Sequence, residues 1–287
     1  MLHRELIKLT LNVTTAIEWM LEKGYLKNSI PCTKCIDKQM KVRFKKGQHI
    51  FKCTKCNTTK SIFYKTIFYN CKKDILELLD LIYFWSLDLN QKKVSYQTNT
   101  KSNETMTGWY KKLCFLSGRI IRKEKNNKKI GGINHIIQID ESKFSKRKYN
   151  IGRHVHSPWI VGGIDLTTKD VFFVEVYKRD STTLKNIILE NVELGSTIFT
   201  DKWKGYANLS DLGYNHADVN HSTNFIDPIT GANTQAIEST WNSYKKLFKA
   251  RSINSSCYIS DLFYEFMLKK KYGNTVFELI LKNIYLI

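Results

Sequence analysis

The sequence lacks any run of about twenty apolar residues, the length that a membrane-spanning helix requires. Residues 1–26 are interrupted by charges every few positions, so they fit neither a signal peptide nor a mitochondrial presequence free of acidic residues. These two absences predict a soluble, intracellular protein.

Acidic residues are scarce: 26 Asp and Glu stand against 46 Lys and Arg, and the formal net charge is +20. The basic residues recur along the chain instead of forming one block. Such a surplus favours a polyanionic partner, with nucleic acid ahead of an anionic membrane surface. The alternative is a Lys-rich genome bias, because Asn and Ile are also abundant.

The cysteine count, seven, is odd, which disfavours a disulfide framework in a reducing compartment. Four cysteines follow a Cys-x2-Cys-x17-Cys-x2-Cys pattern: Cys32, Cys35, Cys53 and Cys56. This spacing is typical of a structural Zn²⁺ site, and alternation around the turn "KKGQ" predicts a hairpin that joins the two pairs. Residues 29–62 are therefore predicted to form a zinc ribbon, since four unligated cysteines would leave too little core to fold. Three others are interpreted as packing residues: Cys71, Cys114 and Cys257.

The segments around the ribbon read as helical. Residues 1–28 contain a predicted leader helix over 5–24, which Gly24 ends. Residues 70–124 contain a helix over 74–89, then a short helix, a turn and a longer helix from about Ser102. One face of that last helix is apolar: Trp109, Leu113, Leu116 and Ile120.

This pattern predicts a helix-turn-helix DNA-binding region whose second helix is the recognition helix. Lys111 and Lys112, on the outer side of that helix, are candidate DNA contacts. The alternative is an ordinary helical hairpin that packs on the next domain. The charged and glycine-rich residues 122–132 are interpreted as a linker.

Residues 134–250 show the order βββαβαβα, which predicts a mixed α/β fold, and 251–287 are predicted to be a C-terminal helical extension. Asp140 ends the strand "IIQID", Asp201 ends the strand "TIFTD", and Glu238 lies on the last helix of the pattern. Sites are built where strands end at one edge of such a sheet, so these acids are expected to meet.

Three unpaired carboxylates would repel one another, whereas two divalent cations remove the repulsion, and oxygen ligands favour Mg²⁺ or Mn²⁺. Each acid alone also fits a structural role, as a strand-end cap, the start of a turn or a solvated helix position.

The motifs "IDES", "TDKWKGY" and "VNHSTNFIDPITGANTQAIESTWNSYK", after a zinc ribbon, resemble the Merlin transposases of eukaryotes and the related bacterial ISXO2-like insertion-sequence transposases. The resemblance covers nearly the whole chain and is strongest over 136–246. It implies an RNase H-like catalytic domain with a DDE triad, whose acids match Asp140, Asp201 and Glu238. In this scheme Asp140 bridges two metal ions and each of the other acids completes one.

The resemblance further implies metal-dependent cleavage and strand transfer of DNA by cut-and-paste transposition. The expected partners are terminal inverted repeats, target DNA and at least one further copy of the chain, because two transposon ends are cut together. The expected location is the nucleus in a eukaryotic host and the cytoplasmic nucleoid in a bacterial one. The alternatives are a transposase-derived, non-catalytic DNA-binding regulator, against which the complete triad argues, and a structure-selective nuclease of the same fold.

Other residues receive auxiliary roles. His221 either touches the scissile phosphate or orients water, or it is a structural histidine. Glu141 directly follows Asp140, so a strand points it to the opposite face. Trp203 and Tyr206 either stack on an unpaired base or pack in the core. Four basic residues of one loop contact phosphate or are merely solvated: Lys146, Arg147, Lys148 and Arg153.

Overall fold

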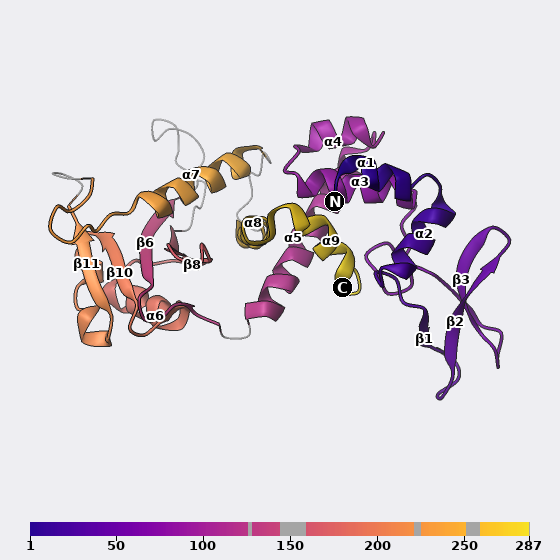
Figure 1. Ribbon diagram of the computed structural model, residues 1–287, viewed down its shortest axis with the longest axis horizontal. Helices are drawn as coiled ribbons and strands as arrows, with labels where there is room; N and C mark the ends of the chain where they lie inside the picture. The colour runs from indigo at the N-terminus through magenta and orange to yellow at the C-terminus, as the bar shows by residue number, and fades with distance from the viewer. Residues whose placement is uncertain (126–127, 144–158, 221–224, 251–258, 287) are drawn as a thin grey trace. The chain divides into compact units, whose positions relative to one another are not determined.

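The computed structural model describes residues 1–125, 128–143, 159–220, 225–250 and 259–286 (Figure 1). The chain divides into two compact units. One comprises residues 1–120 together with 272–287, and the other comprises residues 121–271. Within the described part of the chain, no helix has both the length and the hydropathy that crossing a membrane would require.

The predicted single leader helix is wrong, because two helices occupy this segment: α1 (His3–Leu9) and α2 (Val13–Glu22). The backbone N–H of Thr10 bonds back to the carbonyls of Leu6 and Ile7, which closes α1. Asn12 then starts α2, since its Oδ1 accepts the N–H of Thr15 at 3.0 Å. Gly24, with a φ of 70°, follows the end of α2 as predicted.

The ribbon is a four-stranded antiparallel sheet in the order β1-β2-β3-β4. Its strands are β1 (Ser29–Pro31), β2 (Gln39–Lys45), β3 (Gln48–Cys53) and β4 (Thr59–Ser61). Lys46 and Gly47 join β2 to β3 with φ values of 50° and 76°, the left-handed pair that a tight two-residue hairpin turn needs. The predicted hairpin is confirmed.

Three helices follow the ribbon: α3 (Ile75–Ser86), α4 (Gln91–Gln97) and α5 (Asn103–Lys125). Asp74 and Asn90 cap α3 and α4 by accepting the N–H groups of Leu76 and Lys93. The predicted apolar face of α5 is buried throughout, at 5% exposure or less. The helices are confirmed as elements, and their use as a helix-turn-helix stays a prediction.

The predicted linker over 122–132 is wrong at both ends. Helix α5 continues to Lys125. Ile130–Gly131 form the short strand β5, which pairs in parallel with β9 (Val192–Glu193). Ile130 belongs to the folded unit and not to a linker, because its side chain packs in the hydrophobic core of the second unit.

That unit is built on five strands: β6 (Ile136–Lys143), β7 (Trp159–Asp165), β8 (Val171–Val176), β10 (Thr197–Asp201) and β11 (Asn215–Val219). Their order is β11-β10-β6-β7-β8, in which β6, β7 and β8 are antiparallel and β10 is parallel to both β6 and β11. Its helices include α6 (Ser181–Asn191) and α7 (Gln235–Ala250). The predicted mixed α/β order is present, with the helix between β10 and β11 reduced to the 3-10 turns η2 (Lys204–Tyr206) and η3 (Ser210–Leu212).

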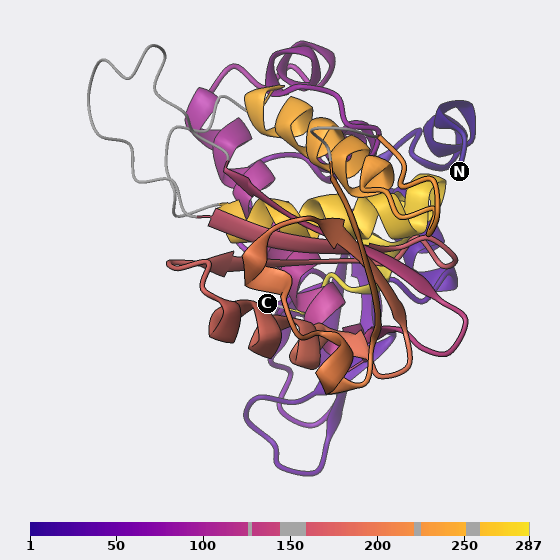
Figure 2. The same ribbon diagram turned by 90° about the vertical axis from the view of Figure 1, so that its left-hand side faces the viewer.

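The two faces of this sheet have different partners, since α6 and α7 lie on opposite sides of it (Figures 1 and 2). Ile137, Ile139 and Ile198 belong to the core cluster that includes Leu184 and other residues of α6. Because side chains alternate along a strand, residues 138 and 140 of β6 belong to the other face, which α7 covers. We call this the α7 face.

The C-terminal extension is divided between the two units. Helix α8 (Ile259–Tyr272) lies almost entirely in the second unit, where Phe263 stacks on Phe173 and Tyr244 with ring centroids 4.7 and 4.3 Å apart. A 3-10 turn, η5 (Gly273–Thr275), and α9 (Val276–Lys282) belong to the first unit, where Phe277 packs on Tyr83.

Candidate active site

Asp140 and Asp201 occupy matching positions on neighbouring parallel strands. The ladder pairs Thr197 with Ile136 and Phe199 with Gln138, and the same register continued by two residues sets Asp201 beside Asp140. Laterally paired residues of a sheet point to the same side. Both acids therefore lie on the α7 face, at the ends of their runs of buried residues.

Glu238 comes to the same face from the first turns of α7. Its N–H bonds to the carbonyl of Thr234, which starts the helix. The Thr234 hydroxyl donates to Glu238 Oε1 at 2.7 Å. Glu238 is exposed, whereas Thr234 is buried. The carboxylate is thus held at the helix start, on the side that faces the two aspartates.

The charges of Asp201 and Glu238 act on the Asp140 carboxyl and raise its pKa. Burial, and then the charges of Asp201 and Glu238, raise the pKa of the Asp140 carboxyl to about 6, although hydrogen bonds from the Glu141 backbone and the Trp241 ring oppose the shift. A carboxyl with this pKa ionises at neutral pH at a cost. A cation that neutralises the group removes that cost.

The carboxylates do not form one compact cluster. Within the described ranges, the cysteine set of the ribbon is the sole group of three or more His, Cys, Asp or Glu whose ligand atoms lie within 4.8 Å of one another. The donor set of carboxylate oxygens alone nevertheless fits Mg²⁺ or Mn²⁺. Acids shared between two cations need not converge on one point.

Trp241 is a site residue that the sequence reasoning missed as such. Its indole Nε1 donates to Asp140 Oδ2 at 3.1 Å. Three residues after Glu238 on α7, it lies on the same side of the helix. Its ring can reach the sheet because Gly162 of β7 has no side chain, and a Cβ built there would lie 2.5 Å from the ring.

Gly162→Ala is therefore expected to displace Trp241 from Asp140. The added methyl group overlaps ring atoms that are packed between strand and helix, so we expect a destabilisation of roughly 1–3 kcal/mol. Thermal unfolding measures this effect. Gly108→Ala is the matched control, since a Cβ at Gly108 meets no atom within 4 Å. Equal behaviour of the two variants would contradict this role of Gly162.

Glu141 points to the opposite face, as predicted from its position after Asp140. It accepts a hydrogen bond from the Tyr206 hydroxyl and lies 3.4 Å from Arg179. Burial raises the pKa of the Glu141 carboxyl to about 7. Tyr206 is 1% exposed, so this part of "KWKGY" packs in the core.

Trp203 is partly buried against the same core. Its ring meets Tyr206 edge-on with centroids 5.9 Å apart, and the Arg179 guanidinium lies 4.9 Å from the ring centre. The ring is engaged within the domain, and stacking on DNA remains a separate hypothesis.

The four cysteines of the ribbon form the second candidate centre. Their sulfur atoms all lie within 4.8 Å of one another, and those of Cys32 and Cys56 are 3.6 Å apart. Four sulfurs at tetrahedral zinc distances would be separated by about 3.8 Å. The backbone N–H groups of Lys34 and Cys35 point at the Cys32 sulfur, as a thiolate requires. The residues fit one structural Zn²⁺.

The predicted DNA contacts are only partly within the described residues. Lys111 and Lys112 are exposed on α5, but the Lys112 ammonium donates to the carbonyl of Ile67 at 3.1 Å and lies 4.4 Å from the centre of the Trp109 ring. Lys112 therefore also serves the packing of its own unit. Outside the described residues lie His221, Lys146, Arg147, Lys148 and Arg153.

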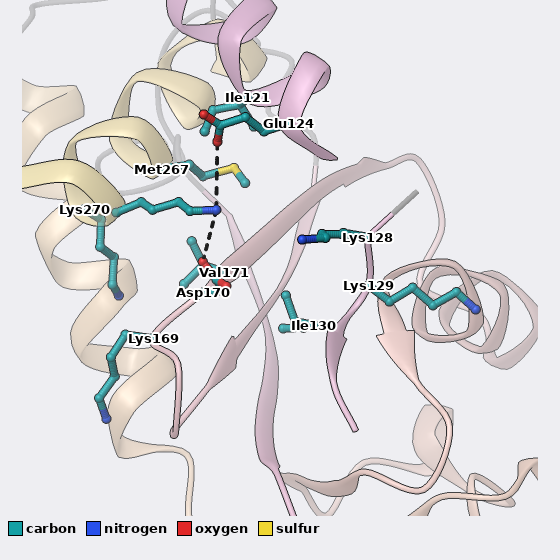
Figure 3. Close-up of a pocket in the computed structure, with 11 residues that line it drawn as sticks. Ile121, Glu124, Lys128, Lys129, Ile130, Lys169, Asp170, Val171, Met267 and Lys270 are labelled. Atoms are coloured by element: carbon teal, nitrogen blue, oxygen red, sulfur yellow. Dashed lines mark ion pairs between the residues drawn. The ribbon is translucent and has the colours of Figure 1, made fainter. Parts of the chain in front are cut away.

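A small cavity of about 110 Å³ lies in the second unit between the end of α5, the β7–β8 turn and α8 (Figure 3). Lysines dominate its rim: Lys128, Lys129, Lys169, Lys270 and Lys271. Lys271 lies 3.9 Å from Glu124 and 3.8 Å from Asp170. None of the three acids of the α7 face lines this cavity. Sequence reasoning missed it because its residues come from three separate segments.

Residues 131–258 match the model of the ISXO2-like transposase domain. The resemblance to the ISXO2-like transposases that the sequence predicted is confirmed over this segment. The matched segment includes the five-stranded sheet and all three acids. No curated protein matches the chain.

The similar solved structures include integrases. A chain of the simian T-cell lymphotropic virus intasome, solved in complex with PP2A regulatory subunit B56 gamma, is 18% identical with a TM-score of 0.33; the alignment covers 50% of each chain. The HTLV-2 integrase catalytic core domain with magnesium, in its dimeric form, is 15% identical with a TM-score of 0.32 over 49% of this chain and 88% of that one. The BIV integrase catalytic core domain is 12% identical with a TM-score of 0.33 over 47% and 82%. The protein thus spans half the length of the first of these chains.

Proposed function

We propose that the protein is a DDE transposase that binds terminal inverted repeats and moves DNA by metal-dependent cleavage and strand transfer. The observation that supports it most is the electrostatic coupling of Asp140 to Asp201 and Glu238 on one face of the sheet, inside the segment that matches a transposase domain. An isolated structural acid has no need of two others beside it.

Asp140, Asp201 and Glu238 would hold two divalent cations, Mg²⁺ or Mn²⁺. When bound, such cations supply a nucleophilic water and stabilise the leaving oxygen of a phosphodiester. The residues of the chain prepare the acids for this task. Trp241 fixes the orientation of the Asp140 carboxylate, and the Thr234 hydroxyl holds Glu238.

The chemistry would proceed in two displacements at phosphorus. In the first, water attacks the phosphorus at the transposon end and the bond from phosphorus to the transposon 3′-oxygen breaks. The transposon strand then ends in a 3′-hydroxyl, and the flanking strand keeps the phosphate at its 5′ end. In the second, that hydroxyl attacks target DNA in line, one P–O bond replaces another, and no external energy source is needed. Two ends must be processed together, so the working form is at least a dimer.

The N-terminal unit would supply recognition of the repeats. The zinc ribbon and helices α4 and α5 carry this role, with Lys111 and Lys112 as phosphate contacts on α5. DNA contacts of the second unit would come from Lys146, Arg147, Lys148, Arg153 and Trp203, and His221 would orient water or the phosphate. The net charge of +20 supplies the sequence-independent part of the affinity.

The test is cleavage of a terminal-repeat duplex with Mg²⁺ or Mn²⁺, comparing the wild type with Asp201→Ala. We expect the variant to bind the duplex normally and to lose roughly 10³-fold or more of the cleavage rate, because the other acids cannot replace a missing ligand. Asp211→Ala, an exposed acid of the same unit, is the control and should cleave as the wild type does.

Repeat binding with no metal-dependent nicking by the wild type would instead indicate a DNA-binding regulator. Cleavage that ignores the repeat sequence would indicate a nuclease. Both results contradict the proposed transposase.

A further inference from the structure

Gln138 is a buried polar residue of β6 that joins the strand to α7. Its side chain is 1% exposed. Its Oε1 accepts the backbone N–H groups of Ala236 at 2.8 Å and Ile237 at 3.1 Å, and its Nε2 donates to Asn233 Oδ1 at 2.7 Å. Both polar atoms of the Gln138 side chain therefore bond to residues at or just before the start of α7.

The first N–H groups of a helix have no partner inside the helix, and a neighbouring residue of the same segment commonly caps them. In α7 a residue almost a hundred positions earlier in the chain supplies the acceptor for two of them. The bond is therefore tertiary: it fixes where the helix begins relative to the central strand of the sheet.

Gln138 lies close to Asp140 on β6, and the N–H groups that it accepts lie next to Glu238 on α7. Asp140 lies two residues beyond Gln138 on the same face of β6, which is about 7 Å along a strand. Glu238 directly follows Ile237, whose N–H Gln138 accepts. A shift of the first turn of α7 would therefore move Glu238 with respect to Asp140 by nearly the same amount.

We propose that Gln138 is a positioning residue that sets the separation of Glu238 from Asp140, so that both acids can bind the same pair of cations. This inference rests on the proposed function. Trp241 supplies a second tether one turn further along the helix, through its bond to Asp140. With both tethers, α7 can neither slide along β6 nor rotate about its own axis without breaking a buried hydrogen bond.

The chemistry of the side chain matters as well as its shape. Methionine has the same length but offers no oxygen, so two buried N–H groups would lose their acceptor and the helix start would shift toward water to regain one. Glutamate loses the bond that the Gln138 amide donates to Asn233, but it keeps the acceptor for both N–H groups, and its charge is favoured at a helix N-terminus. Gln138→Met should therefore disturb the site, and Gln138→Glu should largely restore it.

The experiment measures Mn²⁺ binding to the full-length protein by calorimetric titration at pH 7.5, without DNA, alongside cleavage of the terminal-repeat duplex. We expect Gln138→Met to weaken Mn²⁺ binding by about 10- to 100-fold, as loss of a residue that orients metal ligands does, and Gln138→Glu to stay within a few fold of the wild type. Cleavage should fall in parallel.

The matched control is Asp180→Ala. Asp180 caps α6 of the same unit by accepting the N–H of Thr183 at 2.8 Å, and α6 carries none of the three acids. This variant should lose thermal stability, as Gln138→Met does, but should keep wild-type Mn²⁺ affinity. The comparison separates a positioning role from a general loss of stability.

Two outcomes would overturn the inference in distinguishable ways. If Gln138→Met binds Mn²⁺ as tightly as the wild type while Asp201→Ala does not, Gln138 has no positioning role and the proposed function stands. If the wild type shows no Mn²⁺ binding that depends on Asp201, the proposed function fails and this inference fails with it.

Discussion

Cys53→Ser is expected to unfold the ribbon and to abolish binding of the terminal repeats. Cys53 is completely buried at the end of β3, and its sulfur belongs to the set of four that fits Zn²⁺. Structural zinc contributes about 10–16 kcal/mol to the folding of such small modules, far more than a sheet of short strands can supply from its own core. Zinc content measured after denaturation should fall from one ion per chain toward none.

The control for this variant is Cys71→Ser, a cysteine outside the cluster. It should keep one zinc ion and normal binding of repeat DNA. Cys53→Ser should still show the unfolding transition of the unit formed by residues 121–271, because the ribbon belongs to the other unit. Full zinc content in Cys53→Ser would show that the four sulfurs do not share an ion.

The pKa values of the ribbon cysteines indicate how zinc binding should depend on pH. Hydrogen bonds from Thr58 lower the pKa of Cys56 to about 6, whereas the hydrogen bond to Cys56 helps raise the pKa of Cys35 to about 12. Without metal the group therefore holds protons that Zn²⁺ must displace. Zinc affinity is expected to rise with pH, and protons should be released when zinc binds.

The sequence predicted those parts of the molecule in which a local pattern determines the structure. The spacing of the cysteines and the "KKGQ" turn specify the ribbon, because both act over fewer than thirty residues. The two aspartates were predicted because each was expected to end a buried strand, a position where charge needs a reason. Asp201 does end β10, whereas β6 continues beyond Asp140 to Lys143. The break after Leu9 was missed, since the apolar spacing runs through it and only the cap at Asn12 shows where a new helix starts.

Contacts between distant segments were beyond the reach of such patterns. Nothing near Gln138 in the sequence indicates that its side chain caps a helix that starts almost a hundred residues later. Gly162 and Trp241 likewise gain their meaning only where β7 and α7 pack together.

Asp140→Asn is expected to make the metal-free protein more stable at pH 7.5 while abolishing DNA cleavage. Burial raises the pKa of Asp140 in the folded protein to about 6, above the usual aspartate pKa of 3.8, so ionised Asp140 opposes folding. This rise in pKa corresponds to at most about 3 kcal/mol of lost folding stability at pH 7.5. Asparagine keeps the oxygen that accepts the Trp241 bond and removes the charge, so the melting temperature should rise by several degrees. Asp211→Asn, at an exposed position, should change neither property.

The direction of the pH dependence follows from the same shift. Between about pH 4 and pH 6 the folded wild type binds more protons at Asp140 than the unfolded chain does, so its stability falls as the pH rises through this range. Glu141, with a pKa of about 7, acts in the same direction. The metal-free wild type should therefore become more stable when the pH is lowered from 7.5 to 5, and the gain in Asp140→Asn should be smaller.

A divalent cation should reverse this ranking. Mg²⁺ or Mn²⁺ binds the ionised acids, so it stabilises the wild type at pH 7.5 and does so less at pH 5, where protons compete for Asp140. Asp140→Asn should show little stabilisation by either ion at either pH. Thermal unfolding with and without Mn²⁺ measures all four conditions. A stabilisation that is equal in both proteins would mean that the ion binds elsewhere and that Asp140 has only a structural role. A stabilisation confined to the wild type would mean that the ion binds at Asp140 and offsets the free-energy cost of ionising this buried carboxyl.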